Sequence, residues 1–189
     1  MQNETKGSGF YMQIHKNDKS VTKTIDTIAS DVVKYMVQSG LTLCTAESCT
    51  GGMVSETVTS VSGASAMFLG GVCSYTEEIK QKILGVKKDT LDRYTVYSAQ
   101  VASEMSAGAQ ALFGADCAIG ITGIAGPGGV GEKPAGTVFV SVRVRGVEKV
   151  CDLKIYEQYP DPDRQTVRTV SARRALEMLL ELCSQEARE

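Results

Sequence analysis

Short apolar runs between helical stretches constrain the fold of this chain most. Residues 115–122 (ADCAIGIT) are mostly apolar, which is typical of a central strand that is covered on both faces. Residues 21–36 instead carry apolar side chains at helical spacing, and Gly40 ends that run. This alternation predicts an α/β fold of three layers, α/β/α, with a mixed, mostly parallel sheet of about five strands.

The same patterns predict the individual elements. The expected strands are residues 41–46, 69–75, 115–122, 136–144 and 149–156, and Arg145-Gly146 marks a hairpin between the last two. The expected helices are residues 21–39, 53–61, 77–84, 89–94, 98–113 and 164–183. Residues 1–20 show no sustained periodicity and are expected to be a flexible N-terminal extension, with one domain over residues 21–189.

The charges and the apolar runs exclude two classes of partner. Lys and Arg number 20 against 22 Asp and Glu, a net charge of -2, so the chain lacks the basic excess of nucleic-acid binders. No run of 18 apolar residues is present, so no membrane span is expected. We therefore expect a cytoplasmic protein with a small-molecule substrate, and we expect a homo-oligomer.

The cysteines suggest a reducing compartment. Most of the six lie in apolar runs such as TLCTA and LLELC, and no C-x-x-C spacing is present. We expect them to be buried, reduced thiols without a structural zinc site.

The chain has a single histidine, His15, and it lies in the polar N-terminal stretch. A Ser-His-Asp or Cys-His mechanism needs an imidazole beside its nucleophile, and a zinc site of the common catalytic type needs histidine ligands. If the chain is a hydrolase with a serine or cysteine nucleophile, its base should therefore be another group, and lysine is the usual alternative.

A strand–turn–helix unit contains the first candidate nucleophile in the polar turn Glu47-Ser48-Cys49-Thr50-Gly51-Gly52. Ser48 is expected near unpaired backbone N–H groups at the positive end of a helix dipole, which suits an anion or an oxyanion. The alternative is that Ser48 or Thr50 only caps the helix. Cys49 is a rival nucleophile, although no imidazole is available to pair with its thiolate.

A second glycine-rich loop, residues 123–131, follows the apolar strand and has five glycines in nine positions. Glycines allow backbone N–H groups to approach a phosphate closely. The loop is not a Walker A sequence, because Glu132 separates Gly131 from Lys133. A plain surface loop is the alternative, but two such loops at strand ends favour a ligand site there.

Five segments resemble the CinA C-terminal domain family in order: TAESCTGG (45–52), GGVCSYTEEIKQKILGV (70–86), GITGIAGPGG (120–129), EKPAGTVFV (132–140) and DPDRQTVR (161–168). The resemblance covers about residues 21–184 and implies the same three-layer fold. The family includes bacterial nicotinamide mononucleotide deamidases, so it also implies hydrolysis of that carboxamide to nicotinic acid mononucleotide and ammonia. Many relatives carry a further N-terminal domain for which this chain has no room, so the stand-alone form is expected.

The resemblance also implies the site. Ser48 would be the nucleophile and Lys80, in SYTEEIK, its base, with no metal ion or cofactor required. Arg164 and loop 123–131 would hold the 5′-phosphate of a pyridine mononucleotide. The expected substrate-binding residues are Tyr75, Thr50, Gly51, Thr122, Gly123 and Arg164, with backbone N–H groups near residues 48–52 or 122–126 for the oxyanion. Tyr97 is unusual for the family at the start of the 98–113 helix.

Two alternative functions remain on the sequence. One is a non-catalytic nucleotide-binding module, which would keep the loops and Arg164 without a usable Ser48–Lys80 pair. The other is an interaction protein in DNA uptake or damage responses, against which the absence of a basic stripe argues. Both Ser48 and Lys80 are present, and this favours the enzyme.

Overall fold

A computed structural model describes residues 24–186, so the predictions about residues 1–20, with His15, lie outside the described residues. The strands are β1 (Leu43–Glu47), β2 (Phe68–Cys73), β3 (Cys117–Gly123), β4 (Val138–Val144) and β5 (Val147–Asp152). The α-helices are α1 (Ile25–Ser39), α2 (Met53–Thr59), α3 (Glu77–Leu84), α4 (Lys88–Tyr94), α5 (Ala99–Phe113), α6 (Ile155–Gln158) and α7 (Arg164–Glu186), with a 3-10 turn, η1 (Ala64–Ala66).

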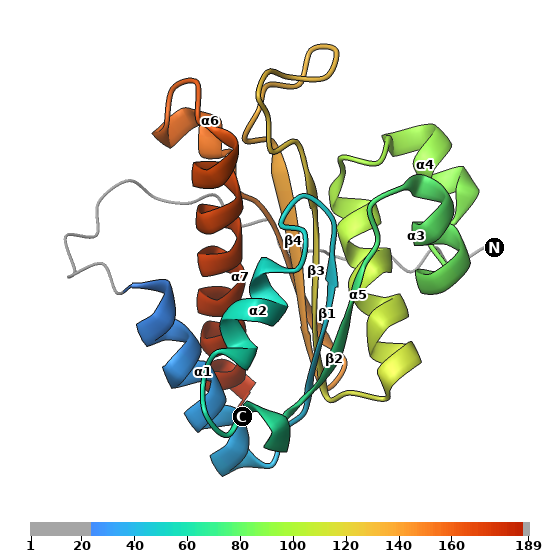
Figure 1. Ribbon diagram of the computed structural model, residues 1–189. Coiled ribbons are helices and arrows are strands. Elements are labelled where there is room, and N and C mark those ends of the chain that lie inside the picture. Colours follow the sequence, from blue (N-terminus) through green and yellow to red (C-terminus); the bar gives the residue numbers. More distant parts are fainter. Residues whose placement is uncertain (1–23, 187–189) are drawn as a thin grey trace.

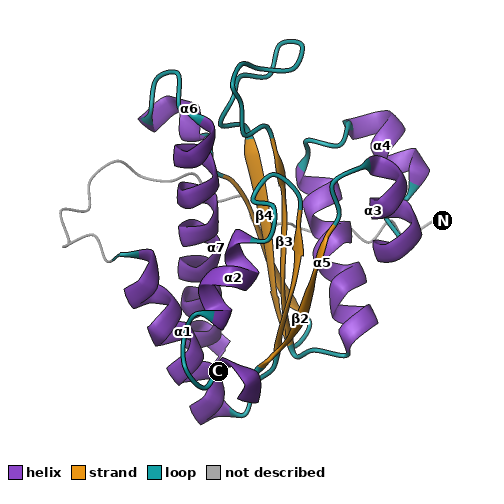
Figure 2. Ribbon diagram, viewed as in Figure 1, coloured by secondary structure: helices purple, strands orange, loops and turns teal. Residues whose placement is uncertain are grey.

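The elements form three layers around one sheet (Figure 1). Helices α1, α2 and α7 cover one face, and α3, α4 and α5 lie on the other, as the purple helices on either side of the orange strands show in Figure 2. Each face has its own cluster of buried apolar side chains: one includes Val32, Met36 and Leu176, and the other includes Val101 and Met105. The predicted α/β/α architecture is confirmed.

The strand order is β2-β1-β3-β4-β5. The first three strands pair in parallel, β4 is antiparallel to β3, and β5 is antiparallel to β4, so four of the five strands run in one direction. The carboxyl ends of β1, β2 and β3 therefore meet at one edge of the sheet. Strand β1 has β2 as its neighbour on one side and β3 on the other, so the chain changes direction along the sheet after β2. The carboxyl end of β1 is therefore a topological switch point, the place where open α/β sheets bind ligands.

Close backbone packing fixes the helices beside this edge. A Cβ atom at Gly108 of α5 would lie 1.9 Å from the carbonyl oxygen of Leu84, the last residue of α3. A Cβ atom at Gly120 of β3 would lie 2.4 Å from the carbonyl oxygen of Ala102. The two glycines let α3 approach α5 and let α5 approach the sheet, so the orientation of α3 toward the strand ends is set by contact.

The predicted strand over residues 149–156 is wrong in its second half. Strand β5 ends at Asp152, and the short helix α6 begins at Ile155. Between them Lys154 adopts a left-handed conformation, with φ of 42°, that a continuous strand does not tolerate.

All six cysteines are free; five of them are buried, and Cys73 at the end of β2 is exposed. Within residues 24–186, no helix has the length and apolar character needed to cross a bilayer. The same residues include no group of three or more His, Cys, Asp or Glu side chains arranged to hold a metal ion.

Candidate active site

Ser48 lies in the tight turn that joins β1 to α2, at the switch point of the sheet. The N–H of Gly51 donates to the carbonyl of Ser48 at 3.0 Å, and both Gly51 and Gly52 have positive φ angles of 63° and 95°. Such angles suit glycine and strain other residues, which explains the Gly-Gly pair. The turn leaves the Ser48 side chain 9% exposed at the wall of a cavity.

Lys80 projects from the first turns of α3 and is completely buried. Its Nζ lies 2.9 Å from Ser48 Oγ and 2.6 Å from the carbonyl oxygen of Ser74. The α3 helix begins where Thr76 caps it, so Lys80 points back toward the end of β1. The structure therefore brings together the two residues that the sequence analysis named as nucleophile and base.

Burial changes the chemistry of this lysine. It lowers the pKa of Lys80 from 10.5 to about 8, against smaller opposing effects of Cys49, Cys73 and Glu77. The ammonium form loses its hydration in the protein interior, so the neutral amine is favoured. An amine with a pKa near 8 can accept a proton from a serine hydroxyl near neutral pH.

Cys49, beside Ser48, is a poor nucleophile in this setting. The residue is 5% exposed, and burial raises the pKa of its thiol to about 12. The thiol consequently stays protonated near neutral pH, although thiolate is the reactive form of cysteine. This removes the rival that the sequence left open.

Glu47 occupies the N-terminus of α2. Its carboxylate is 1% exposed and accepts hydrogen bonds from the backbone N–H groups of Gly52, Val54 and Ser55 at 2.9–3.1 Å, and from the Ser55 hydroxyl at 2.7 Å. The expectation of unpaired N–H groups at this helix end is therefore wrong. An internal carboxylate has taken the place that an external anion would take.

A cavity of about 350 Å³ opens beside Ser48 and Lys80. Of the predicted substrate-binding residues, Tyr75, Gly123 and Arg164 line it. Thr50, Gly51 and Thr122 are not among the described residues that line it. Thr122 is fully buried, and its hydroxyl donates to the carbonyl of Val96 at 2.8 Å, so it supports the wall from behind.

The glycine loop forms a large part of the cavity wall, from Gly123 to Val130. The loop projects beyond the end of the sheet between β3 and β4 (Figure 1). Within the described part of the chain, the backbone N–H groups of Ala125, Gly126, Gly128 and Gly129 have no hydrogen-bond partner. Unpaired N–H groups in a glycine-rich loop are suited to phosphate oxygens.

Arg164 joins two walls of the cavity. It donates from Nη1 to the carbonyl of Gly126 at 2.8 Å and from Nη2 to the hydroxyl of Tyr75 at 2.7 Å. The side chain is the first of α7, and Asp163 caps this helix by accepting from the N–H of Thr166. A guanidinium has five N–H donors, so Arg164 keeps donors for an anion in the cavity.

Sequence reasoning missed three residues around the site. Arg168 donates from Nε and Nη2 to the carbonyl of Thr50 at 3.2 and 3.0 Å, which holds the nucleophile turn against α7. Its position four residues after Arg164 on one helix face was the available signal. Glu77 lines the cavity, and Lys133 donates to the Thr95 hydroxyl and the Tyr97 carbonyl at 2.9 and 2.8 Å, which ties the glycine loop to the wall that Tyr97 forms.

Comparison with known proteins gives consistent matches. The CinA C-terminal domain matches residues 25–183. A CinA-like protein of Thermotoga neapolitana is 46% identical over 150 residues, which are 78% of this chain and 35% of that protein. A CinA-like protein of a Synechococcus species is 45% identical over 155 residues, which are 82% of this chain and 36% of that protein. The chain thus spans about a third of the length of these relatives.

Solved structures extend the match to nearly whole chains. The competence/damage inducible protein CihA from Agrobacterium tumefaciens superposes with a TM-score of 0.80 at 35% identity, over 87% of this chain and 99% of that one. A competence-damaged protein (CinA) superfamily protein from Escherichia coli superposes with a TM-score of 0.81 at 33% identity, over 88% of this chain and 94% of that one.

Proposed function

Because the chain belongs to the CinA C-terminal domain family, we propose that it is an amidohydrolase that deamidates nicotinamide mononucleotide. The products are nicotinic acid mononucleotide and ammonia, and the reaction would serve pyridine nucleotide recycling. The observation that carries the proposal is the 2.9 Å contact between Ser48 Oγ and the buried Lys80 Nζ. A serine paired with a lysine whose pKa is lowered is a known solution for nucleophilic catalysis without histidine.

In the first half-reaction, the lone pair of the neutral Lys80 amine accepts the Ser48 hydroxyl proton as Oγ attacks the carboxamide carbon. The tetrahedral intermediate collapses by breaking the C–N bond, and the Lys80 ammonium gives its proton to the departing nitrogen, which leaves as ammonia. The product of this stage is an ester between Ser48 and the nicotinoyl group. Water then attacks the ester with Lys80 again as base, and the carboxylate product leaves Ser48 free.

Two features support an anionic substrate. The residues with unpaired N–H groups, which are Ala125, Gly126, Gly128 and Gly129, line the same cavity as Arg164, so both could bind one phosphate. Glu47 pairs with the N–H groups of Gly52, Val54 and Ser55, so the oxyanion would be bound by other N–H groups, either in the turn beside Ser48 or near residues 122–126. A cavity of about 350 Å³ lies near the lower end of the usual range of about 300–1,000 Å³ for small-molecule sites.

The test is release of ammonia from nicotinamide mononucleotide, with nicotinamide riboside and NAD as comparison substrates. We expect turnover of the mononucleotide, weaker turnover of the riboside and little of the dinucleotide. Absence of ammonia from all three, with a folded protein at pH 9, would favour the non-catalytic nucleotide-binding alternative. Binding of the mononucleotide by calorimetry separates that alternative from a protein with no affinity for nucleotides.

A further inference from the structure

Ser74 lies between β2 and α3, and both its backbone N–H and its carbonyl form hydrogen bonds at the candidate site. Its N–H donates to the carbonyl of Glu47, the residue before the nucleophile, at 2.8 Å. Its carbonyl accepts from Lys80 Nζ at 2.6 Å. The residue is completely buried. Ser74 is thus held against the nucleophile turn on one side and against the base on the other.

The Ser74 hydroxyl has no use in the resting structure. Its Oγ is inaccessible to solvent and has no hydrogen-bond partner among the described residues. A buried polar atom without a partner costs stability, so such atoms call for an explanation. A structural role would require a partner that the hydroxyl lacks.

Lys80 has the complementary deficit, because one of its N–H donors has no acceptor among the described residues. The Nζ atom contacts two oxygen atoms, Ser48 Oγ and the Ser74 carbonyl oxygen. A neutral amine offers two N–H donors and one lone pair, whereas an ammonium offers three donors. When the lone pair faces the Ser48 hydroxyl and one N–H donates to the Ser74 carbonyl, the other N–H has no acceptor among the described residues. After the amine takes the serine proton, this N–H belongs to an ammonium, and a charged donor makes a stronger hydrogen bond.

We propose that Ser74 is a positioning residue for the base, whose hydroxyl accepts the third hydrogen bond of the Lys80 ammonium during the reaction. The carbonyl of the same residue already contacts Nζ, so rotation about the Cα–Cβ bond of Ser74 can bring Oγ toward the amine. The Ser74 hydroxyl gains and loses no proton in this step. The proton moves from Ser48 to Lys80 and then to the leaving nitrogen. The proposal rests on the proposed function in one respect, namely that Lys80 is the base.

Other groups near Lys80 do not fill this place. The titratable side chains that face it are Cys49 from the nucleophile turn, Cys73 from the end of β2 and Glu77 from the start of α3. Burial raises the pKa of both thiols, so near neutral pH they remain neutral and are weak acceptors. Glu77 is exposed to solvent at the first residue of the helix.

The experiment measures the pKa of Lys80 directly, without substrate. The protein is labelled with 13C at lysine Cε, the Lys80 signal is identified by its loss in Lys80→Arg, and the signal is followed from pH 6 to pH 11. We expect Ser74→Ala to lower the pKa of Lys80 by about one unit, because a hydrogen bond to the charged form is lost. Ser74→Thr keeps the hydroxyl and should restore the wild-type value.

The matched control is Ser106→Ala, because Ser106 is also completely buried but its hydroxyl is paired. Thermal unfolding should show a lower Tm for Ser106→Ala and an unchanged or higher Tm for Ser74→Ala, which removes an unpaired hydroxyl. An unchanged Lys80 pKa in Ser74→Ala, or a loss of Tm as large as that of Ser106→Ala, overturns the proposal. A lowered pKa in a protein that releases no ammonia supports Ser74 and overturns the proposed function instead.

Discussion

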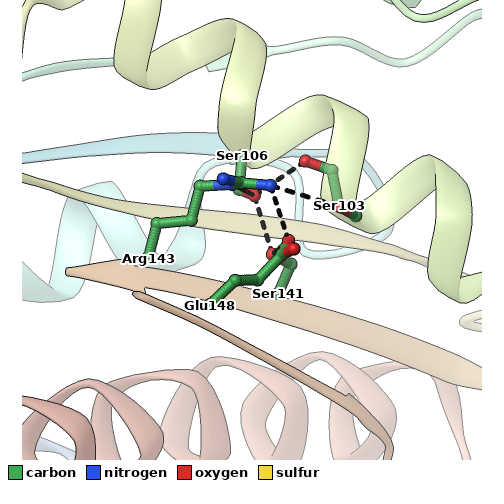
Figure 3. A network of polar contacts seen from close by, with 5 residues as sticks. All are labelled: Ser103, Ser106, Ser141, Arg143 and Glu148. Carbon is green, nitrogen blue, oxygen red and sulfur yellow. Dashed lines mark hydrogen bonds and ion pairs between the residues drawn. The ribbon is translucent and has the colours of Figure 1, made fainter. Parts of the chain in front are cut away.

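Two polar clusters lie on the same sheet and differ in how completely their buried atoms are paired. The first joins α5 to the antiparallel strands and consists of Ser103, Ser106, Ser141, Arg143 and Glu148 (Figure 3). There the Arg143 guanidinium contacts Glu148 at 2.9 Å and Ser106 at 3.1 Å, and the Ser106 and Ser141 hydroxyls are 2.7 Å apart. The second is the candidate site, where Ser74 Oγ and Thr50 Oγ1 have no partner among the described residues.

The difference separates a structural role from a chemical one. In the antiparallel half of the sheet, a carboxylate balances the arginine and the hydroxyls bond to one another, so the network stabilises one arrangement. In the parallel half, Lys80 is buried with no carboxylate of residues 24–186 in contact, and its pKa falls to about 8. Groups that change their charge need such a setting, at a cost in stability.

The largest expected effect is on Ser48. Ser48→Ala should reduce kcat by about a thousand-fold or more, because a nucleophile cannot be replaced by binding alone. The Tm should stay close to that of the wild type. Ser60→Ala, an exposed serine near the end of α2, is the control and should have no effect on kcat. A Ser48→Ala variant within about tenfold of wild type would show that Ser48 is not the nucleophile.

The next effect is that of pH on turnover. With a Lys80 pKa of about 8, the neutral amine is about a hundredth of the total at pH 6 and predominates above pH 9. The kcat for ammonia release should thus rise roughly a hundred-fold between these limits and then level off. A profile that is flat from pH 6 to pH 9 contradicts a lysine base.

The same lysine should make stability depend on pH. Its folded pKa of about 8 lies below the ordinary 10.5, so between these values the unfolded chain binds the proton and the folded protein does not. The free energy of unfolding should then rise with pH across this window, by up to about 3 kcal/mol relative to Lys80→Met. Denaturant titrations of both proteins at pH 7.5 and pH 10 measure the difference.

Replacing Arg164 of the candidate site and Arg143 of the other cluster should have different effects. Arg164→Ala should raise KM for the mononucleotide by about ten- to thirty-fold, by loss of charge-assisted hydrogen bonds to phosphate, with little change for the riboside. Arg143→Ala should instead lower the Tm by removing the partner of Glu148, and it should leave both KM values unchanged. Equal effects of Arg164→Ala on the two substrates would mean that it does not bind the phosphate.

The smallest effect is expected in the paired cluster. Ser106→Ala removes a hydroxyl that bonds to Ser141 and Arg143, so it should lower the free energy of unfolding by about 1 kcal/mol. The kcat and KM should not change, since the cluster does not line the cavity. Urea unfolding with a parallel ammonia assay tests both statements, and a large loss of turnover would show that the two clusters are coupled.

The layers and most element boundaries were predicted from periodicity and from strand–turn–helix order, which are local. The pairing of Ser48 with Lys80 was implied by the resemblance to the CinA C-terminal domain family, in agreement with the lack of a histidine outside the N-terminal stretch. Occupation of the α2 N-terminus by Glu47 was not predictable, because it depends on the direction of one side chain after a strand. The carbonyl contacts of Arg168 and Thr122 were missed for a related reason, since they join segments far apart in the chain. The catalytic and binding roles themselves remain predictions.

Because one cysteine is exposed and five are buried, the native protein can be labelled selectively at a single thiol. In the native protein, a maleimide should label Cys73 before the other five thiols, whereas all six should react after denaturation. Cys73 is two residues from Tyr75, which lines the cavity. A fluorophore attached through that single thiol would therefore report ligand entry by its emission, with no cysteine substitution elsewhere in the chain.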